Sequence, residues 1–209
     1  ATFNAQVWDP WNAGNNVTSA PASILIDTYN TTGNSNTAIG HRVFRSNTTG
    51  NQNTALGLGA LANNTTGSYN IAIGKDALND NTTAEHNCAI GAYTLDECTT
   101  GYQNIAIGNY CLGELSTGAN NTAIGYAALL SHTTGTDNVA IGRDVARRMI
   151  CGCYNVLMGD NVLNRIHRGR YNVMLGTSVG AAFTQGATSV TNNVFIGRCA
   201  AINQQSNVT

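Results

Sequence analysis

The hydrophobic and polar positions of this chain repeat with a period of 17 residues. Each copy starts with Asn, continues with a short run such as Thr-Ala-Ile or Val-Ala-Ile, and reaches Gly four residues after the Asn. We number the positions of a copy as slots 1 to 17 from this Asn. Ten copies in phase do not arise by chance, so the chain is an array of one structural unit. The slot 1 residues are Asn36, Asn53, Asn70, Asn87, Asn104, Asn121, Asn138, Asn155, Asn172 and, after one longer step of 21 residues, Asn193.

Each copy predicts two short strands and two corners. The run at slots 2–4 predicts one strand, and slots 7–9, where slot 8 is small or β-branched and slot 9 is usually Leu, predict another. Gly at slot 5, and at slot 15 of a recurring Thr-Thr-Gly, gives the backbone freedom that corners need. Gly, Asn and Thr are poor helix formers. We therefore predict an all-β fold, a parallel β-solenoid (β-roll) of about ten 17-residue coils over residues 34–202.

Stacked coils place the same slot of every copy in one column along a rod. Slot 1 becomes a ladder of Asn side chains that hydrogen-bond between coils, which is a structural role. Neighbouring residues of a strand point to opposite faces, and we assign slots 2 and 4 to the core. Slot 3 then faces outward although it is never polar, so we predict that it lines the axis of a homotrimer. Its residues are Ala38, Ala55, Ala72, Ala89, Ala106, Ala123, Ala140, Leu157, Met174 and Phe195.

Both ends of the chain lie outside the repeat. Residues 1–33 include an alternating segment, 22–29, that predicts a strand. The end of a solenoid exposes unpaired backbone, so residues 1–33 are expected to cap it or to connect subunits by donating a strand to the next one of a filament. Residues 203–209 are expected to form a tail. The chain has no run of 18 apolar residues that would span a membrane, and its first residues lack the features of a signal peptide.

Composition narrows the set of partners. Charged residues make up 10% of the chain, against roughly 25% in average soluble domains. The net charge of −1 argues against electrostatic capture of nucleic acid. We expect the cysteines to form disulfides in an oxidising compartment rather than to remain free thiols, with the pairing left open. The cysteines are Cys88, Cys98, Cys111, Cys151, Cys153 and Cys199.

Slot 11 carries Asp80, Glu97 and Glu114 in successive copies, and Arg148 and Arg165 further on. Carboxylates stacked about 5 Å apart repel one another. A solvated column is the favoured interpretation; a Ca²⁺ ion bridging two acids and contact with an Arg column of a neighbouring molecule are the alternatives. No other cofactor is indicated. The arginines of the later copies form a solvated face, or a contact for an anionic glycan or for the end of another rod.

No catalytic motif is present, and we expect no enzymatic activity. The four His residues occupy different slots, and no Gly-x-Ser-x-Gly sequence occurs. Asn-x-Ser/Thr sequences mark candidate glycosylation sites, three of which share slot 12 and would carry glycans in one line along the rod. The candidates are Asn16, Asn30, Asn47, Asn63, Asn64, Asn81, Asn120 and Asn207.

The pattern Asn-Thr-Ala-Ile-Gly, followed by Ala-Leu and Asn-Thr-Thr-Gly, resembles the head repeats of trimeric autotransporter adhesins. It is even more similar to the shaft repeats of tail-fibre-like proteins of phages and large algal viruses. The resemblance covers residues 36–202, although adhesin head repeats are shorter than 17 residues and Thr-Thr-Gly lapses after Gly135. It implies a homotrimeric, extracellular, non-enzymatic rod on a cell or virion surface, acting as a fibre or filament or as an adhesin for a cell-surface glycan or receptor. The alternatives are a tailspike-like fibre that binds or degrades polysaccharide and, because Thr recurs, an ice-binding solenoid.

Overall fold

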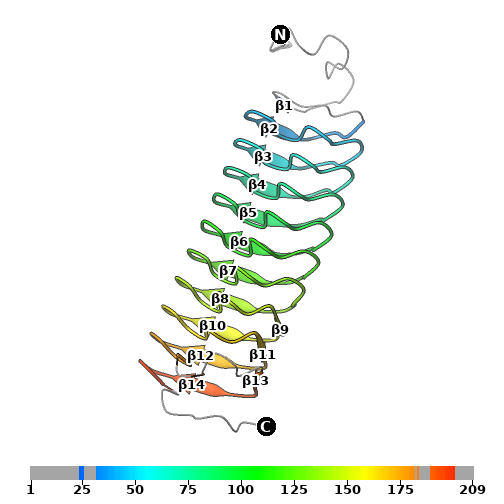
Figure 1. Ribbon diagram of the computed structural model, residues 1–209. Coiled ribbons are helices and arrows are strands. Elements are labelled where there is room, and N and C mark those ends of the chain that lie inside the picture. Colours follow the sequence, from blue (N-terminus) through cyan, green and yellow to red (C-terminus); the bar gives the residue numbers. More distant parts are fainter. Residues whose placement is uncertain (1–23, 26–31, 182, 184–188, 201–209) are drawn as a thin grey trace.

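The chain folds into a rod of stacked coils (Figure 1). The computed structural model describes residues 24–25, 32–181, 183 and 189–200. Within the described part of the chain, no helix is long and apolar enough to cross a bilayer. Most of residues 1–33, for which we predict a cap or a connecting segment, lies outside the described residues, and so does the whole of the predicted tail at 203–209.

One parallel sheet of eleven strands runs the length of the rod, and each copy of the repeat contributes slots 2–4 to it (Figure 1). Its strands pair in register, slot against slot, as in Ala106 opposite Ala123. The strands are β1 (Ile24–Leu25), β2 (Thr37–Ile39), β3 (Thr54–Leu56), β4 (Ile71–Ile73), β5 (Cys88–Ile90), β6 (Ile105–Ile107), β7 (Thr122–Ile124), β8 (Val139–Ile141), β10 (Val156–Met158), β12 (Val173–Leu175) and β14 (Val194–Ile196).

The predicted all-β parallel solenoid is confirmed. The ten copies of the repeat contribute the strands β2 to β14 of the main sheet, and about nine complete turns join them. The tenth copy runs into residues that the structure does not describe. Strand β1 comes from the segment at 22–29 and pairs parallel to β2, with Ile24 opposite Thr37. The N-terminal segment thus adds one further rung to the main sheet.

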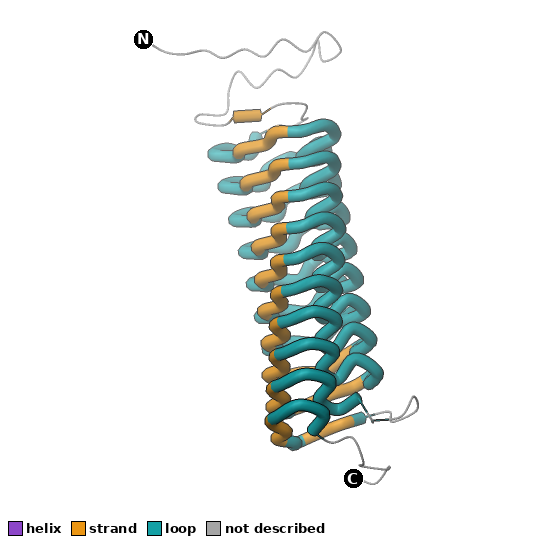
Figure 2. The backbone as a smooth tube through the Cα atoms, turned by 90° about the vertical axis from the view of Figure 1, so that its left-hand side faces the viewer, coloured by secondary structure: helices purple, strands orange, loops and turns teal. Residues whose placement is uncertain are grey.

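The corner after each strand depends on the slot 5 glycine. These glycines have φ between 118° and 143°, a region that L side chains rarely adopt. At Gly108 an added Cβ would lie 2.4 Å from the carbonyl oxygen of Gly125 in the next coil. Glycine at this slot therefore allows both the turn and the close stacking of coils seen in Figure 2.

The second strand predicted over slots 7–9 is wrong. These residues form turns, in which slots 7 and 9 have left-handed backbone, for example Tyr110 with φ 58° and Leu112 with φ 50°. Left-handed residues cannot continue a β ladder. Among the described residues, a second sheet of three strands forms in the last coils, where Thr-Thr-Gly has lapsed. Its strands are β9 (Cys151–Cys153), β11 (Arg168–Arg170) and β13 (Val190–Thr191).

The core is a column inside the coils, and it contains slot 3. Ala106, Leu157 and Met174 are completely buried and pack with the slot 9 leucines, while Phe195 in the last coil is partly buried. The prediction that slot 3 faces outward and lines a trimer axis is therefore wrong. Slot 3 lies inside the coil as Ala in seven copies and as the larger Leu157 and Met174 in two later ones, all of them buried. Slots 2 and 4 face outward instead.

Candidate functional surfaces

The slot 1 asparagines form a continuous ladder from Asn36 to Asn193. At Asn104, the side-chain Nδ2 donates to Oδ1 of Asn87 (3.0 Å) and to the carbonyl oxygen of Gly118 (2.9 Å). Its own Oδ1 accepts from both the backbone N–H and the Nδ2 of Asn121 (3.0 Å each). The same pattern joins each coil to the next, and from Asn36 to Asn172 these side chains are buried. The ladder therefore has the structural role that the sequence predicts.

A second column of buried asparagines lies at slot 12. Asn47 donates from Nδ2 to the carbonyl oxygen of Gly50 and accepts from the Gly50 N–H, both at 3.1 Å, so it closes the Thr-Thr-Gly corner. Asn64 and Asn81 are equally buried. The prediction of glycans on these three residues is wrong, because their amide nitrogens lie inside the coil and are hydrogen-bonded.

The remaining candidate glycosylation sites stand apart from this column. Asn120 is exposed at slot 17 and Asn63 is half-buried. Asn16, Asn30 and Asn207 lie outside the described residues.

The cysteines are free thiols, so the expectation of disulfides is wrong within this chain. The six occupy six different slots, and stacking therefore never brings two of them into register. Burial raises the pKa of the Cys98 and Cys111 thiols to about 12. These two side chains act as small core residues.

The acids of slot 11 form no three-ligand cluster among the described residues, and a Ca²⁺ ion bridging two of them stays a prediction. In the described ranges, no three His, Cys, Asp or Glu side chains lie close enough together to hold an ion, and this includes Asp80, Glu97 and Glu114. Carboxylates do gather here: burial, followed by the charges of Asp80, Asp76 and Glu97, raises the pKa of Asp96 to about 6. The acidic coils therefore form a region of mutual repulsion.

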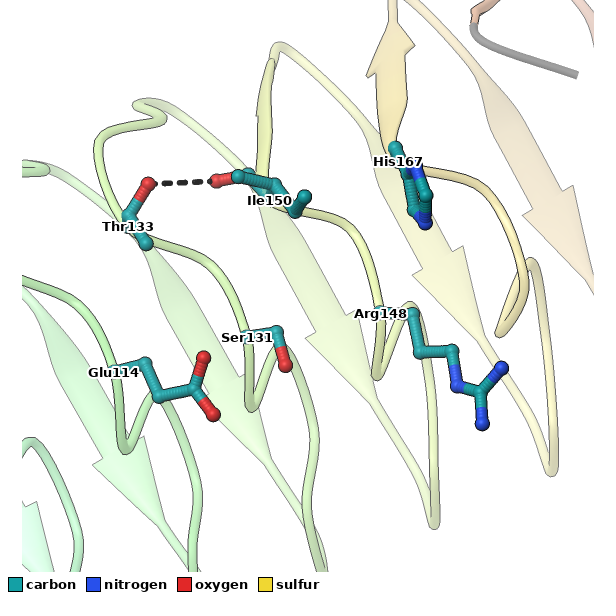
Figure 3. Close-up of a pocket in the computed structure, with 6 residues that line it drawn as sticks. All are labelled: Glu114, Ser131, Thr133, Arg148, Ile150 and His167. Atoms are coloured by element: carbon teal, nitrogen blue, oxygen red, sulfur yellow. Dashed lines mark hydrogen bonds between the residues drawn. The ribbon is translucent and has the colours of Figure 1, made fainter. Parts of the chain in front are cut away.

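A shallow groove of about 470 Å³ opens where the acidic coils give way to basic ones. Figure 3 shows two rows of side chains along it, from slots 11 and 13 of successive coils. Within the slot 13 row, Thr133 Oγ1 donates to the carbonyl oxygen of Ile150 in the next coil (3.1 Å). The slot 11 row is Glu114, Ser131 and Arg148, and the slot 13 row is Thr133, Ile150 and His167.

The arginines of these basic coils fall into two groups. Arg143 binds Asp160 through Nε (2.8 Å) and a terminal nitrogen (3.1 Å), and Arg147 contacts Asp144 (3.3 Å). The second group is exposed and takes part in none of the ion pairs of the described residues. Its members are Arg148, Arg165, Arg168 and Arg170. Basic side chains without an acidic partner are thus concentrated beside the groove.

The outer face of the main sheet is an apolar surface that runs along the rod. We call the slot 2 and slot 4 residues of β2–β8, β10, β12 and β14 the outer sheet face. None of them is charged from Thr37 to Ile196. Nine of its large side chains are between 36% and 68% exposed: Ile39, Leu56, Ile71, Ile105, Ile107, Val156, Met158, Val194 and Ile196.

The sequence contained one signal that slots 2 and 4 face outward and slot 3 faces inward. Slot 2 accepts Thr at Thr37, Thr54 and Thr122, whereas slot 3 is never polar, so slot 3 is the better candidate for the interior. Exposed or half-buried tyrosines stack in pairs at slots 17 and 7. Tyr154 stacks on Tyr171 with ring centroids 5.2 Å apart, as Tyr93 does on Tyr110.

A comparison of the chain with models of protein families, with characterised proteins and with solved structures finds no match.

Proposed function

We propose that this chain is a structural module of an extracellular fibre, a non-enzymatic rod in which three copies pack along the outer sheet face. The observation that carries the proposal is that this face has Ile, Leu or Met at slot 4 of every copy and no charged residue over the whole stack of coils. The resemblance to fibre and adhesin repeats supplies the number of copies and the location at a cell or virion surface.

The outer sheet face needs a partner on physical grounds. Parallel sheets are normally covered on both sides, and here the coil's own core covers only the inner side. Soluble monomers rarely expose so extended an apolar surface. A second copy fits such a face because both surfaces have the same periodicity, with one rung about every 4.8 Å. Copies related by a rotation axis along the rod would bury this face from end to end.

The polar side chains of the repeat are used to hold the rod together. Slot 1 Asn joins coil to coil, and slot 13 Thr hydroxyls donate to the carbonyl oxygen one coil on, as Thr65 does to Thr82 (2.8 Å). This use of polar groups supports a load-carrying role. The slot 13 hydroxyls are also occupied in this way rather than free to face ice, so the ice-binding alternative gains no support from them.

The proposal is tested by the mass of the protein in solution. The wild-type protein should have three times the chain mass of 21.9 kDa. Ile107→Glu should dissociate it to monomers with an unchanged circular dichroism spectrum, because Ile107 lies in the middle of the outer sheet face and is 37% exposed. Thr100→Glu, an exposed slot 14 change on another side of the coil, should leave the assembly intact.

A monomeric wild type, or an Ile107→Glu protein that remains assembled, would refute the packing face. If the wild type has twice the chain mass and Ile107→Glu reduces it to a monomer, the packing face is supported but the assembly is a dimer and not a trimer.

A further inference from the structure

The groove of Figure 3 combines four kinds of side chain in a short distance. A guanidinium lies at one end, a carboxylate lies two coils away at the other, a serine hydroxyl lies between them, and an exposed isoleucine forms part of the opposite wall. Its volume of about 470 Å³ falls in the range of small-molecule sites, roughly 300–1,000 Å³. The groove is formed by slots 11 and 13, about half a copy away from slots 2–4. It therefore stays open whether or not the rods associate along the outer sheet face.

We propose that this groove binds a carboxylate-bearing sugar of an acidic glycan. The sugar carboxylate pairs with Arg148 beside His167, and sugar hydroxyls hydrogen-bond to Ser131 and Glu114. This binding activity goes beyond the structural role and does not depend on it.

Arg148 is the anchor for the carboxylate. A guanidinium offers a planar pair of donors that matches a carboxylate, which a lysine does not. Arg148 is exposed and makes none of the ion pairs found in the described residues, whereas Arg147 next to it is held by Asp144. Arg148 is thus the guanidinium in the groove that is ready to receive an external anion.

The rest of the groove suits a sugar better than a simple anion. Glu114 and Ser131 provide oxygens that accept hydrogen bonds from hydroxyl groups. Ile150 is 44% exposed and offers an apolar surface to the C–H groups of a sugar ring. Glu114 is two coils from Arg148, roughly 10 Å, so its charge is well separated from the sugar carboxylate and largely screened.

The column continues in a way that fits a polymer. Arg165 occupies slot 11 one coil after Arg148, and Arg168 and Arg170 on β11 are exposed nearby. A chain of acidic sugars that lies along the rod would meet Arg148 in one coil and Arg165 in the next, about 4.8 Å further on. The carboxylate of Glu114 and the net charge of −1 disfavour a densely charged phosphate polymer such as nucleic acid.

The test is a binding panel with matched ligands. The probes are uronic-acid oligosaccharides and sialylated glycans, the methyl esters of the same compounds, and a single-stranded oligonucleotide. We expect the full chain to bind at least one acidic glycan and to bind its methyl ester at least tenfold more weakly in calorimetric titrations. Arg148→Ala should weaken binding at least tenfold, and Arg147→Ala should not change it.

Equal binding of acid and ester, wild-type affinity in Arg148→Ala, or no binding of any acidic glycan on the panel would overturn the proposal. Tighter binding of the oligonucleotide than of every glycan would also overturn it. Both arginines are exposed, so circular dichroism of the two variants should match that of the wild type.

Discussion

At the scale of single residues, stability depends on a few buried polar side chains that repeat in columns. The slot 1 Asn is the main example, because each amide makes bonds to the coil before and the coil after it. Slot 12 shows that a column can change character without loss of the fold. It begins with Asn47, Asn64 and Asn81, continues with Cys98 and later holds Leu, His, Met and Ile, all of them buried.

Asn104→Ala should lower the free energy of unfolding by about 3 kcal/mol, because Asn121 and Gly118 would each keep a buried polar group without its partner. Asn109→Ala is the control: Asn109 is exposed and accepts one bond, from the Ala92 N–H at 3.2 Å. Its replacement should cost less than 1 kcal/mol, as expected for an exposed hydrogen bond. Chemical denaturation of both variants measures the difference, and equal midpoints would contradict the ladder's role.

His132 should make the fold sensitive to acid. Its side chain is fully buried at slot 12, with Nδ1 3.1 Å from the carbonyl oxygen of Met149 and Nε2 3.3 Å from Nδ2 of Asn138. Burial lowers the pKa of His132 from 6.5 to about 4. The unfolded chain therefore binds a proton between these two pH values when the folded chain does not, and stability falls as the pH drops from about 6.5 to 4. The loss amounts to about 3 kcal/mol.

His132→Leu is the matched change, since Leu115 occupies the same slot one coil earlier. As the pH falls across this range, the melting temperature of the wild type should drop relative to that of His132→Leu. The raised pKa of Asp96 acts in the opposite direction, because protonation of its carboxyl relieves burial and repulsion. Asp96 is present in both proteins, so their difference isolates His132. Parallel pH profiles would refute the assignment.

At the scale of the coil, the backbone rather than the side chains sets the path. Gly at slot 5 turns the chain out of the strand, and left-handed residues at slots 7, 9 and 17 bring it around. Many of these residues are Leu or Tyr, which are uncommon in this conformation. The strain is tolerated because every coil repeats it and the stacked backbones hydrogen-bond to one another, as Leu112 N–H does to the carbonyl oxygen of Ala128 (3.0 Å).

Gly108→Ala should destabilise the fold by about 3 kcal/mol or more, because it combines left-handed strain with a backbone clash. The added Cβ would lie 2.4 Å from the Gly125 carbonyl oxygen, which cannot move without displacing the next coil. Gly113→Ala is the control, since its Cβ would lie 3.0 Å from the end of the Leu130 side chain and in ordinary contact with the carbonyl oxygens of Tyr93 (3.4 Å) and Tyr110 (3.5 Å), and its φ lies outside the left-handed region. Thermal melting of the two variants should separate them clearly; similar melting temperatures would show that the corner can relax.

At the scale of the whole molecule, the rod is a one-dimensional stack in which each coil contacts its two neighbours. Its stability is then close to a sum of coil and interface contributions. The same arrangement produces surfaces that no single coil has. These are the outer sheet face, proposed to bind other copies, and the groove between acidic and basic coils, proposed to bind acidic glycan.

Deletion of residues 104–120 removes one complete copy and joins Gln103 to Asn121 in phase. We expect the shortened chain to fold and to have the wild-type circular dichroism spectrum. The slope of its free energy of unfolding against denaturant concentration should be reduced in proportion to the lost coil. Deletion of residues 104–111 removes about half a copy and puts every later slot out of register, so that chain should not fold. If both deletions behaved alike, the independence of the coils would be refuted.

The sequence by itself determined the features that depend on period and local chemistry. Ten in-phase copies specified the stacked parallel coils, the place of the strands at slots 2–4 and the Asn ladder, because identical slots must superpose. The tertiary structure decided which face of each strand points inward. A strand of three residues with Ile, Ala and Ile is apolar on both faces, so alternation leaves two orientations open.

The choice between them is made by the closure of the coil. Left-handed backbone at Leu112 and its equivalents brings slot 9 inside, where it packs in one core with slot 3. The same closure buries Asn47, Asn64 and Asn81, which the sequence marks as glycosylation sites, and places Glu114, Ser131 and Arg148 along one groove. These outcomes depend on the path of the chain through residues at positive φ, and Leu or Tyr at such positions carries no local signal of it.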